Sequence, residues 1–164
     1  MLRRRRAPDS VRAAVPPGDR LASWALTPEG FPVVATTQGL VLPGRDRISW
    51  HAVEKASWDR PRLTVLVLAD GPAVQSGAGP SYAVVLDDPR DLPEVVRTRV
   101  TGSVAWSSHA TLQPSGGVRV VGRRNPDREV FDWQLVFDVG TDPTDPGIRA
   151  QAQDVLEAAR RTIG

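Results

Sequence analysis

The sequence predicts an α+β protein that is mainly β, built on an antiparallel meander of short strands. Over residues 32–69, apolar runs rich in β-branched and aromatic residues alternate with short Gly, Pro and Asp turns, which is typical of strands. Turns this short cannot connect parallel strands, so neighbours in the sequence are expected to be neighbours in the sheet. The amphipathic pattern of residues 146–163 then predicts a C-terminal helix that closes the meander.

The chain begins with a segment that we expect to be a flexible basic arm, residues 1–19. It has no strong hydrophobic period and it ends in Pro-Pro-Gly-Asp. Residues 20–164 are predicted to form a single domain, because a chain of 164 residues suits one core. An alternative boundary near residues 101–103 would separate residues 103–164 from the meander.

Strands are expected where short apolar runs, or runs that alternate with polar residues, are bounded by turn signals. The clearest alternation lies at residues 131–138, where aromatic and aliphatic side chains face one way and polar ones the other. The Gly- and Pro-rich residues 70–80 are expected to be a mobile loop, and residues 123–128 a polar turn. In order, the predicted strands are residues 20–27, 32–37, 40–42, 48–50, 53–58, 62–69, 81–87, 104–112, 118–122 and 131–138.

Capping signals mark the starts of two helices. Asp91 and Glu94 have the spacing of a capping box, which predicts a short helix near residues 92–100. Asp145 is followed by a proline, the pattern of an N-cap and first helical position, so the closing helix is expected at residues 146–163.

The composition excludes several classes of protein. The chain has no cysteine, so neither a disulfide nor a thiolate metal site can form. No apolar run approaches the length of about 18 residues that a membrane-spanning helix needs. No apolar segment of about 7–15 residues follows the first arginines, as a secretion signal would require, so a cytoplasmic location is expected.

Basic charge is concentrated at the start of the chain. Residues 1–20 hold six Arg and two Asp, a sum of +4, and the whole chain is +2, so residues 21–164 sum to −2. Lys55 is the single lysine beside 20 arginines, which is typical of a bacterium with a GC-rich genome. The arginine excess is therefore no sign of a nucleic-acid-binding fold, which clusters its basic residues on the folded part.

One stretch of the meander resembles a known family. The segments VATT, GLVL, ISW, VEK and LTV within residues 32–69 resemble, in that order, bacterial PH-like domains of an uncharacterised, actinobacterial type. The resemblance implies a strongly bent β-barrel or sandwich closed by a C-terminal helix. It implies binding of lipids, peptides or proteins, and no catalytic residues or cofactor.

The chain offers little for catalysis. Ser107 and His109 can share one face of a strand, but neither lies in a nucleophile-elbow context, and His51 stands at a strand bend. We expect both histidines to be surface or half-buried residues, and no enzyme activity, metal or cofactor. An enzyme would require a pocket in which one of these histidines lies near a carboxylate.

Arginines in turns and in the arm are the candidate binding residues. The first hypothesis is a non-catalytic binding or scaffold module, whose protein or peptide partner docks on a sheet edge or in an apolar groove beside the helix. The alternative is a peripheral binder of acidic lipid or nucleic acid through the arm. Anion-binding candidates are the turn residues Arg45, Arg47, Arg123 and Arg124, and the arm residues Arg3, Arg4, Arg5 and Arg6.

Overall fold

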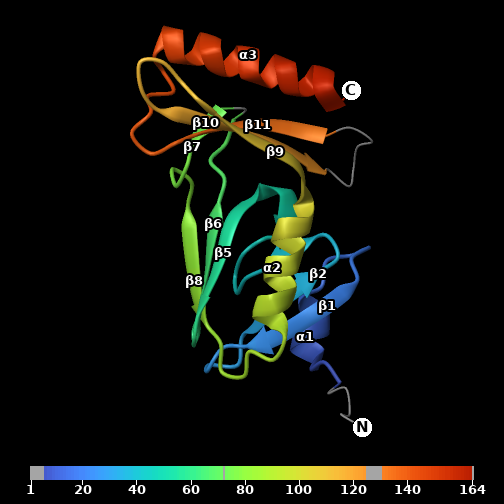
Figure 1. The fold of residues 1–164 in the computed structure, drawn as a ribbon. Helices are drawn as coiled ribbons and strands as arrows, with labels where there is room; N and C mark the ends of the chain where they lie inside the picture. The colour runs from blue at the N-terminus through green and yellow to red at the C-terminus, as the bar shows by residue number, and fades with distance from the viewer. Residues whose placement is uncertain (1–5, 72, 125–130, 164) are drawn as a thin grey trace. The chain divides into compact units, whose positions relative to one another are not determined.

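The computed structural model describes residues 6–71, 73–124 and 131–163 (Figure 1). The chain divides into two compact units, unit 1 (Met1–Val65 and Ser81–Thr101) and unit 2 (Leu66–Pro80 and Gly102–Gly164). The sequence suggested a single domain over residues 20–164. One division falls between Thr101 and Gly102, where the sequence analysis placed its alternative boundary.

Unit 1 begins with an antiparallel meander of the predicted kind. The strands β1 (Leu21–Leu26), β2 (Pro32–Thr36), β3 (Gly39–Val41) and β4 (Ile48–Ser49) pair in sequence order. Short turns join them, and each strand therefore folds back on the one before it.

A second antiparallel layer of strands follows in the chain. The strands β5 (Val53–Asp59), β6 (Arg62–Val67) and β8 (Ser81–Val85) form a sheet in that order. The 3₁₀ helix η1 (Trp50–Ala52) lies between the two sheets in sequence and takes in Trp50, which we predicted as part of a strand. Among the residues that the structure describes, these sheets do not close into a barrel.

The helix α2 (Leu92–Ser103) is longer than the predicted helix at residues 92–100, and all but its last two residues belong to unit 1. Leu92, Val96 and Val100 are buried at a spacing of four residues, so they lie on one face. The start of the helix is fixed to β1, because the Ser23 hydroxyl donates to Asp91 Oδ1 at 2.6 Å.

The predicted flexible arm contains a helix, α1 (Asp9–Ala14), which lies against β2. Val11 is fully buried there, and the Arg12 guanidinium pairs with the Asp9 carboxylate one turn earlier. The prediction of flexibility over residues 1–19 is therefore wrong for α1. The helix was missed because its six residues are too few to show a hydrophobic period in the sequence. It is held by packing of its buried Val11.

Unit 2 is a sheet in the order β7 (Ala73–Gln75), β11 (Phe131–Phe137), β10 (Gly117–Arg124) and β9 (Val104–Thr111). The last three strands of the chain pair antiparallel, whereas β7 pairs parallel with β11. The prediction of a loop throughout residues 70–80 is therefore wrong at β7.

The strand β7 is held by burial as well as by pairing. Val74 is buried in a small apolar cluster with Leu68, Val121 and Val136. The three residues of β7 are too few to show alternation in the sequence, which explains why the strand was missed.

The helix α3 (Pro146–Ile163) covers one face of this sheet, as Figure 1 shows for β10 and β11. Its N-cap is the predicted one: Asp145 Oδ1 accepts the backbone N–H groups of Gly147 at 2.9 Å and Ile148 at 3.1 Å. The apolar stripe of this helix was predicted to pack on the meander, but it packs on β9, β10 and β11. The cluster comprises Ile148, Ala152, Leu156 and Ala159 from the helix with Leu112, Val118, Val120, Leu135 and Phe137.

Candidate functional site

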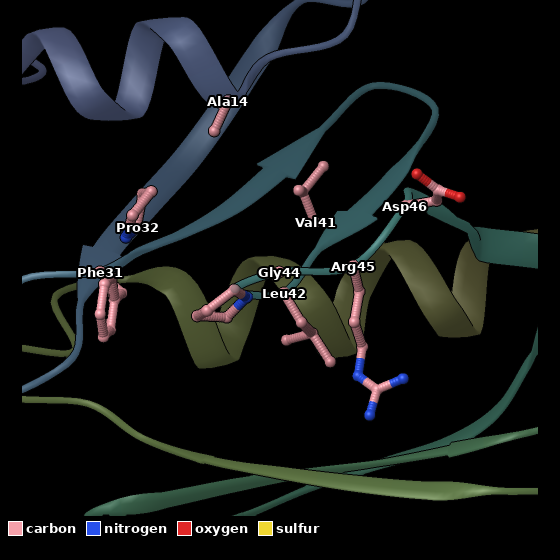
Figure 2. Close-up of a pocket in the computed structure, with 9 residues that line it drawn as sticks. Ala14, Phe31, Pro32, Val41, Leu42, Gly44, Arg45 and Asp46 are labelled. Carbon is pink, nitrogen blue, oxygen red and sulfur yellow. The ribbon is translucent and has the colours of Figure 1, made fainter.

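An open pocket of about 370 Å³ lies in unit 1, beside the end of α1 (Figure 2). Its lining is mainly apolar, and it comes from α1, from the turn before β2 and from the turn after β3. The lining residues are Ala14, Phe31, Pro32, Val41, Leu42, Pro43, Gly44, Arg45 and Asp46. A concave apolar surface of this size suits one or two hydrophobic side chains of a ligand.

A tight turn between β1 and β2 presents Phe31 to solvent. The Phe31 N–H donates to the Thr27 hydroxyl at 3.1 Å, and the Thr27 N–H donates to the Phe31 carbonyl at 2.9 Å. Gly30 supplies the positive φ, 88°, that this turn needs. Phe31 is 56% exposed, although it lies beside an apolar pocket.

A second turn, after β3, forms the opposite end of the pocket. The Arg45 N–H donates to the Leu42 carbonyl at 3.2 Å, and Gly44 has a φ of 69°. Leu42 is buried below the turn, while Arg45 and Asp46 are exposed. Figure 2 shows Phe31 at one end of the lining, and Arg45 and Asp46 at the other.

Arg45 is the one predicted binding residue that lines this pocket. Its guanidinium carbon lies 3.9 Å from the centroid of the Tyr82 ring on β8, a cation–π contact. Asp46 follows it directly, so the rim of the pocket carries one charge of each sign. This arrangement does not provide the cluster of cations that an anionic headgroup would require.

Arg47 has a structural role. Its Nη1 lies 2.7 Å from Asp19 Oδ1, and the Asp19 side chain is only 3% exposed. Asp19 Oδ2 also accepts the Thr36 hydroxyl at 2.7 Å. Arg47 therefore neutralises a buried carboxylate at the start of unit 1, which leaves it poorly placed to bind an external anion.

The second predicted pair of arginines is separated by burial. Arg123 is buried on β10, where its Nη1 donates to Ser103 Oγ at 3.0 Å, while Arg124 is exposed at the end of the same strand. The prediction of a turn that starts at Arg123 is wrong, because β10 extends through Arg124. Residues 125–128 of the predicted turn lie outside the described residues.

The arm arginines are only partly described. Arg6 is exposed, and Arg3, Arg4 and Arg5 lie outside the described residues. The helix that follows them, α1, contributes Ala14 to the pocket. Of the residues that line the pocket, only Arg45 was predicted to bind a ligand, because a pocket formed by two turns and a short helix has no sequence motif.

Comparison of the chain with protein-family models, with curated proteins and with solved structures gives no match. Function must therefore be inferred from the chain's own side chains.

The two histidines occupy different surroundings. His109 Nε2 lies 2.7 Å from Asp138 Oδ2 in unit 2, and both side chains are partly exposed. Ser107 shares the face of β9 with His109, but its hydroxyl accepts a hydrogen bond from Arg119 Nη1 at 3.0 Å. His51 is half-buried in η1.

His109 has the carboxylate of Asp138 within reach, as a catalytic histidine would need. The two side chains lie on the surface of a sheet, however, and the hydroxyl of the nearby Ser107 accepts a hydrogen bond from Arg119. Gly117 lies under the pair, since a Cβ there would be 2.7 Å from His109 Nε2.

Within residues 6–71, 73–124 and 131–163, no three His, Asp or Glu side chains gather as metal ligands. Over the same part of the chain, no helix combines the length and apolar character that crossing a bilayer demands.

Proposed function

We propose that the chain is a non-catalytic binding module, in which a PH-like unit 1 receives an apolar side chain of a partner protein in the pocket beside α1. The PH-like assignment is supported by the order of elements, a four-stranded and then a three-stranded antiparallel sheet followed by a helix. The exposed ring of Phe31 at the mouth of an apolar pocket is the observation that carries the proposal. Exposed aromatic residues with a polar rim are typical of protein–protein contact sites.

A protein partner fits the charges of the pocket better than a lipid headgroup does. The rim holds Arg45 and Asp46 together, and Arg47 is bound to Asp19. An interface of this kind has an apolar centre and a polar rim of mixed sign, and a partner residue such as Leu or Phe would fill the centre.

The area of Phe31 sets the size of the expected effect. A phenylalanine side chain has about 200 Å² of surface, so an exposed fraction of 56% leaves about 110 Å² for a partner to cover. At about 25 cal/mol per Å², burial of that area is worth about 3 kcal/mol, or about 100-fold in affinity as an upper bound.

The test compares three full-length baits in lysate of the source organism: the wild type, Phe31→Asp and Val139→Asp. Val139 is 85% exposed and lies in unit 2, so it controls for a new surface charge. Quantitative mass spectrometry of the captured proteins should show a partner whose capture falls at least about 10-fold with Phe31→Asp only. A photo-cross-linking side chain at position 31 should then label that same protein. Identical captured sets for the three baits would overturn the proposal.

Binding of an anionic surface by Arg3, Arg4, Arg5 and Arg6 remains the alternative proposal. Removal of residues 1–7 leaves α1 in place, so it separates the two ideas. If the arm binds an anionic surface, the full chain should bind vesicles with acidic lipid, or DNA, in a salt-sensitive way. The truncated chain should not bind them. The pocket proposal expects the truncation to leave partner capture unchanged.

A further inference from the structure

The strand β9 forms one edge of the sheet in unit 2 and lacks the usual protection of an edge. It is eight residues long, and its sequence VAWSSHAT contains no Lys, Arg, Asp, Glu, Pro or Gly. Natural edge strands avoid pairing with other chains by being short, by carrying charge, or by containing proline. The other edge of this sheet, β7, has three residues, and the edge strand β5 in unit 1 carries Glu54, Lys55 and Asp59.

Hydrogen bonds fix which residues of β9 point outward. The Leu112 N–H donates to the Gly116 carbonyl at 2.9 Å, and the register runs without a shift from Thr111↔Gly117 to Trp106↔Gly122. Because the bonding direction alternates along an antiparallel strand, Ala110, Ser108 and Trp106 bond to β10. The N–H and C=O groups of the alternate residues then point away from the sheet, and their side chains are also exposed: Ser107, His109 and Thr111.

We propose that β9 pairs antiparallel with β9 of a second copy of this chain, which joins two unit 2 sheets into one continuous sheet. Outward-bonding residues must face each other in such a pair. Several registers satisfy this requirement, and the side chains select the one that places Ser107 opposite His109 of the second copy. Ser108 then lies on the two-fold axis opposite its own copy.

The side chains of β9 suit this register. Trp106 lies opposite Ala110 of the second copy, so a large side chain meets a small one on the face that carries α3. Both residues are half-buried and pack against the core beneath α3. No like charges face each other, because the strand has no Lys, Arg, Asp or Glu, and a neutral strand that complements itself favours a second copy over a foreign peptide.

Cysteine substitution tests the register directly, since the natural chain has no cysteine. Ser108→Cys places two thiols opposite each other at a non-hydrogen-bonded pair, where Cα atoms are about 4.5 Å apart, a distance a disulfide can span. Ser115→Cys, in the exposed turn before β10, measures random collision, and Ser107→Cys measures the neighbouring register.

Under mild oxidation of the full chain, Ser108→Cys should form a disulfide-linked dimer at least about 10-fold faster than either control, because pairing makes the reaction effectively intramolecular. Light scattering of the wild type should show a dimer fraction that rises with concentration. Ser107→Pro removes one outward N–H, which an edge strand tolerates, so it should reduce that fraction while circular dichroism stays unchanged. Equal rates for all three cysteine variants, faster linkage of Ser107→Cys, or a wild type that is monomeric at every concentration would overturn the proposal.

Discussion

Replacement of Thr36 by valine removes a hydroxyl that holds the turn between β2 and β3. Thr36 is fully buried, and its Oγ1 donates to Asp19 Oδ2 at 2.7 Å. The same oxygen accepts the backbone N–H groups of Gln38 and Gly39, each at 3.1 Å. The hydroxyl is also 3.2 Å from the Gly39 carbonyl. Valine replaces the hydroxyl by a methyl group of similar size, so the substitution removes these hydrogen bonds without creating a cavity.

The cost follows from the groups that lose their partner. The Gly39 N–H is buried, and an unsatisfied buried donor costs about 1–3 kcal/mol. Loss of the bond to the carboxylate of Asp19, which is nearly inaccessible to water, adds about 1.5–3 kcal/mol. We therefore expect Thr36→Val to lower the free energy of unfolding by about 3–5 kcal/mol.

The next residue provides a matched control. Thr37 Oγ1 accepts only an exposed N–H, that of Arg20, at 3.3 Å among the bonds described for it, so Thr37→Val should cost less than about 1 kcal/mol. Urea unfolding followed by circular dichroism gives both free energies. Hydrogen exchange should show the loss at the amides of β2 and leave those of β10 unchanged. If the two variants differ by less than about 1 kcal/mol, the hydroxyl does not hold the turn in the way described.

Three further predictions concern the helices and one carboxylate. Val11→Asp places a charge in a fully buried position and should destabilise unit 1 by about 3 kcal/mol or more, exposing the N-terminus to protease, whereas Ala13→Asp, at an exposed position, should not. Asp145→Ala removes the N-cap of α3 and should lower the free energy of unfolding, measured in urea, by about 1 kcal/mol. An unchanged free energy would show that the cap does not stabilise the helix. Hydrogen bonds from the hydroxyl and then the N–H of Thr144 lower the pKa of Asp142 below its ordinary value of 3.8. The stabilisation is present above pH 3.8 and is lost as the pH falls through the lowered pKa, so Thr144→Val should raise the pKa in an NMR titration.

Long periodic segments were predictable because their local signals agree with their packing. The strand predicted at residues 131–138 is β11, and the N-cap predicted at Asp145 begins α3. The pairing of β1 to β4 in sequence order was also predicted from their short turns. The prediction of one meander over residues 32–69 is wrong between β4 and β5, which lie in different sheets.

What the sequence did not show depends on contacts between distant residues. Nothing local distinguishes the stripe of α3 that packs on β10 from a stripe that would pack on the meander, because both sheets offer valine and leucine. Arg123 has the appearance of a turn residue in the sequence, but its burial beside Ser103 is decided by tertiary structure. The pocket beside α1 was missed for the same reason, since Ala14 and Phe31 are 17 residues apart and neither belongs to a binding motif.

The parallel pair of β7 and β11 has a consequence for synthesis on the ribosome. Ala73 is translated long before Leu135, its partner in the pair, and the antiparallel hairpin of β9 and β10 between them can form while the chain is still growing. Residues 73–75 therefore stay unpaired until β11 has left the ribosomal exit tunnel. A chain truncated at Thr101 lacks β11 and cannot form this pair. Truncation at one point therefore cannot yield unit 1 alone, because residues 66–80 of unit 2 remain and Val74 loses the cluster that buries it.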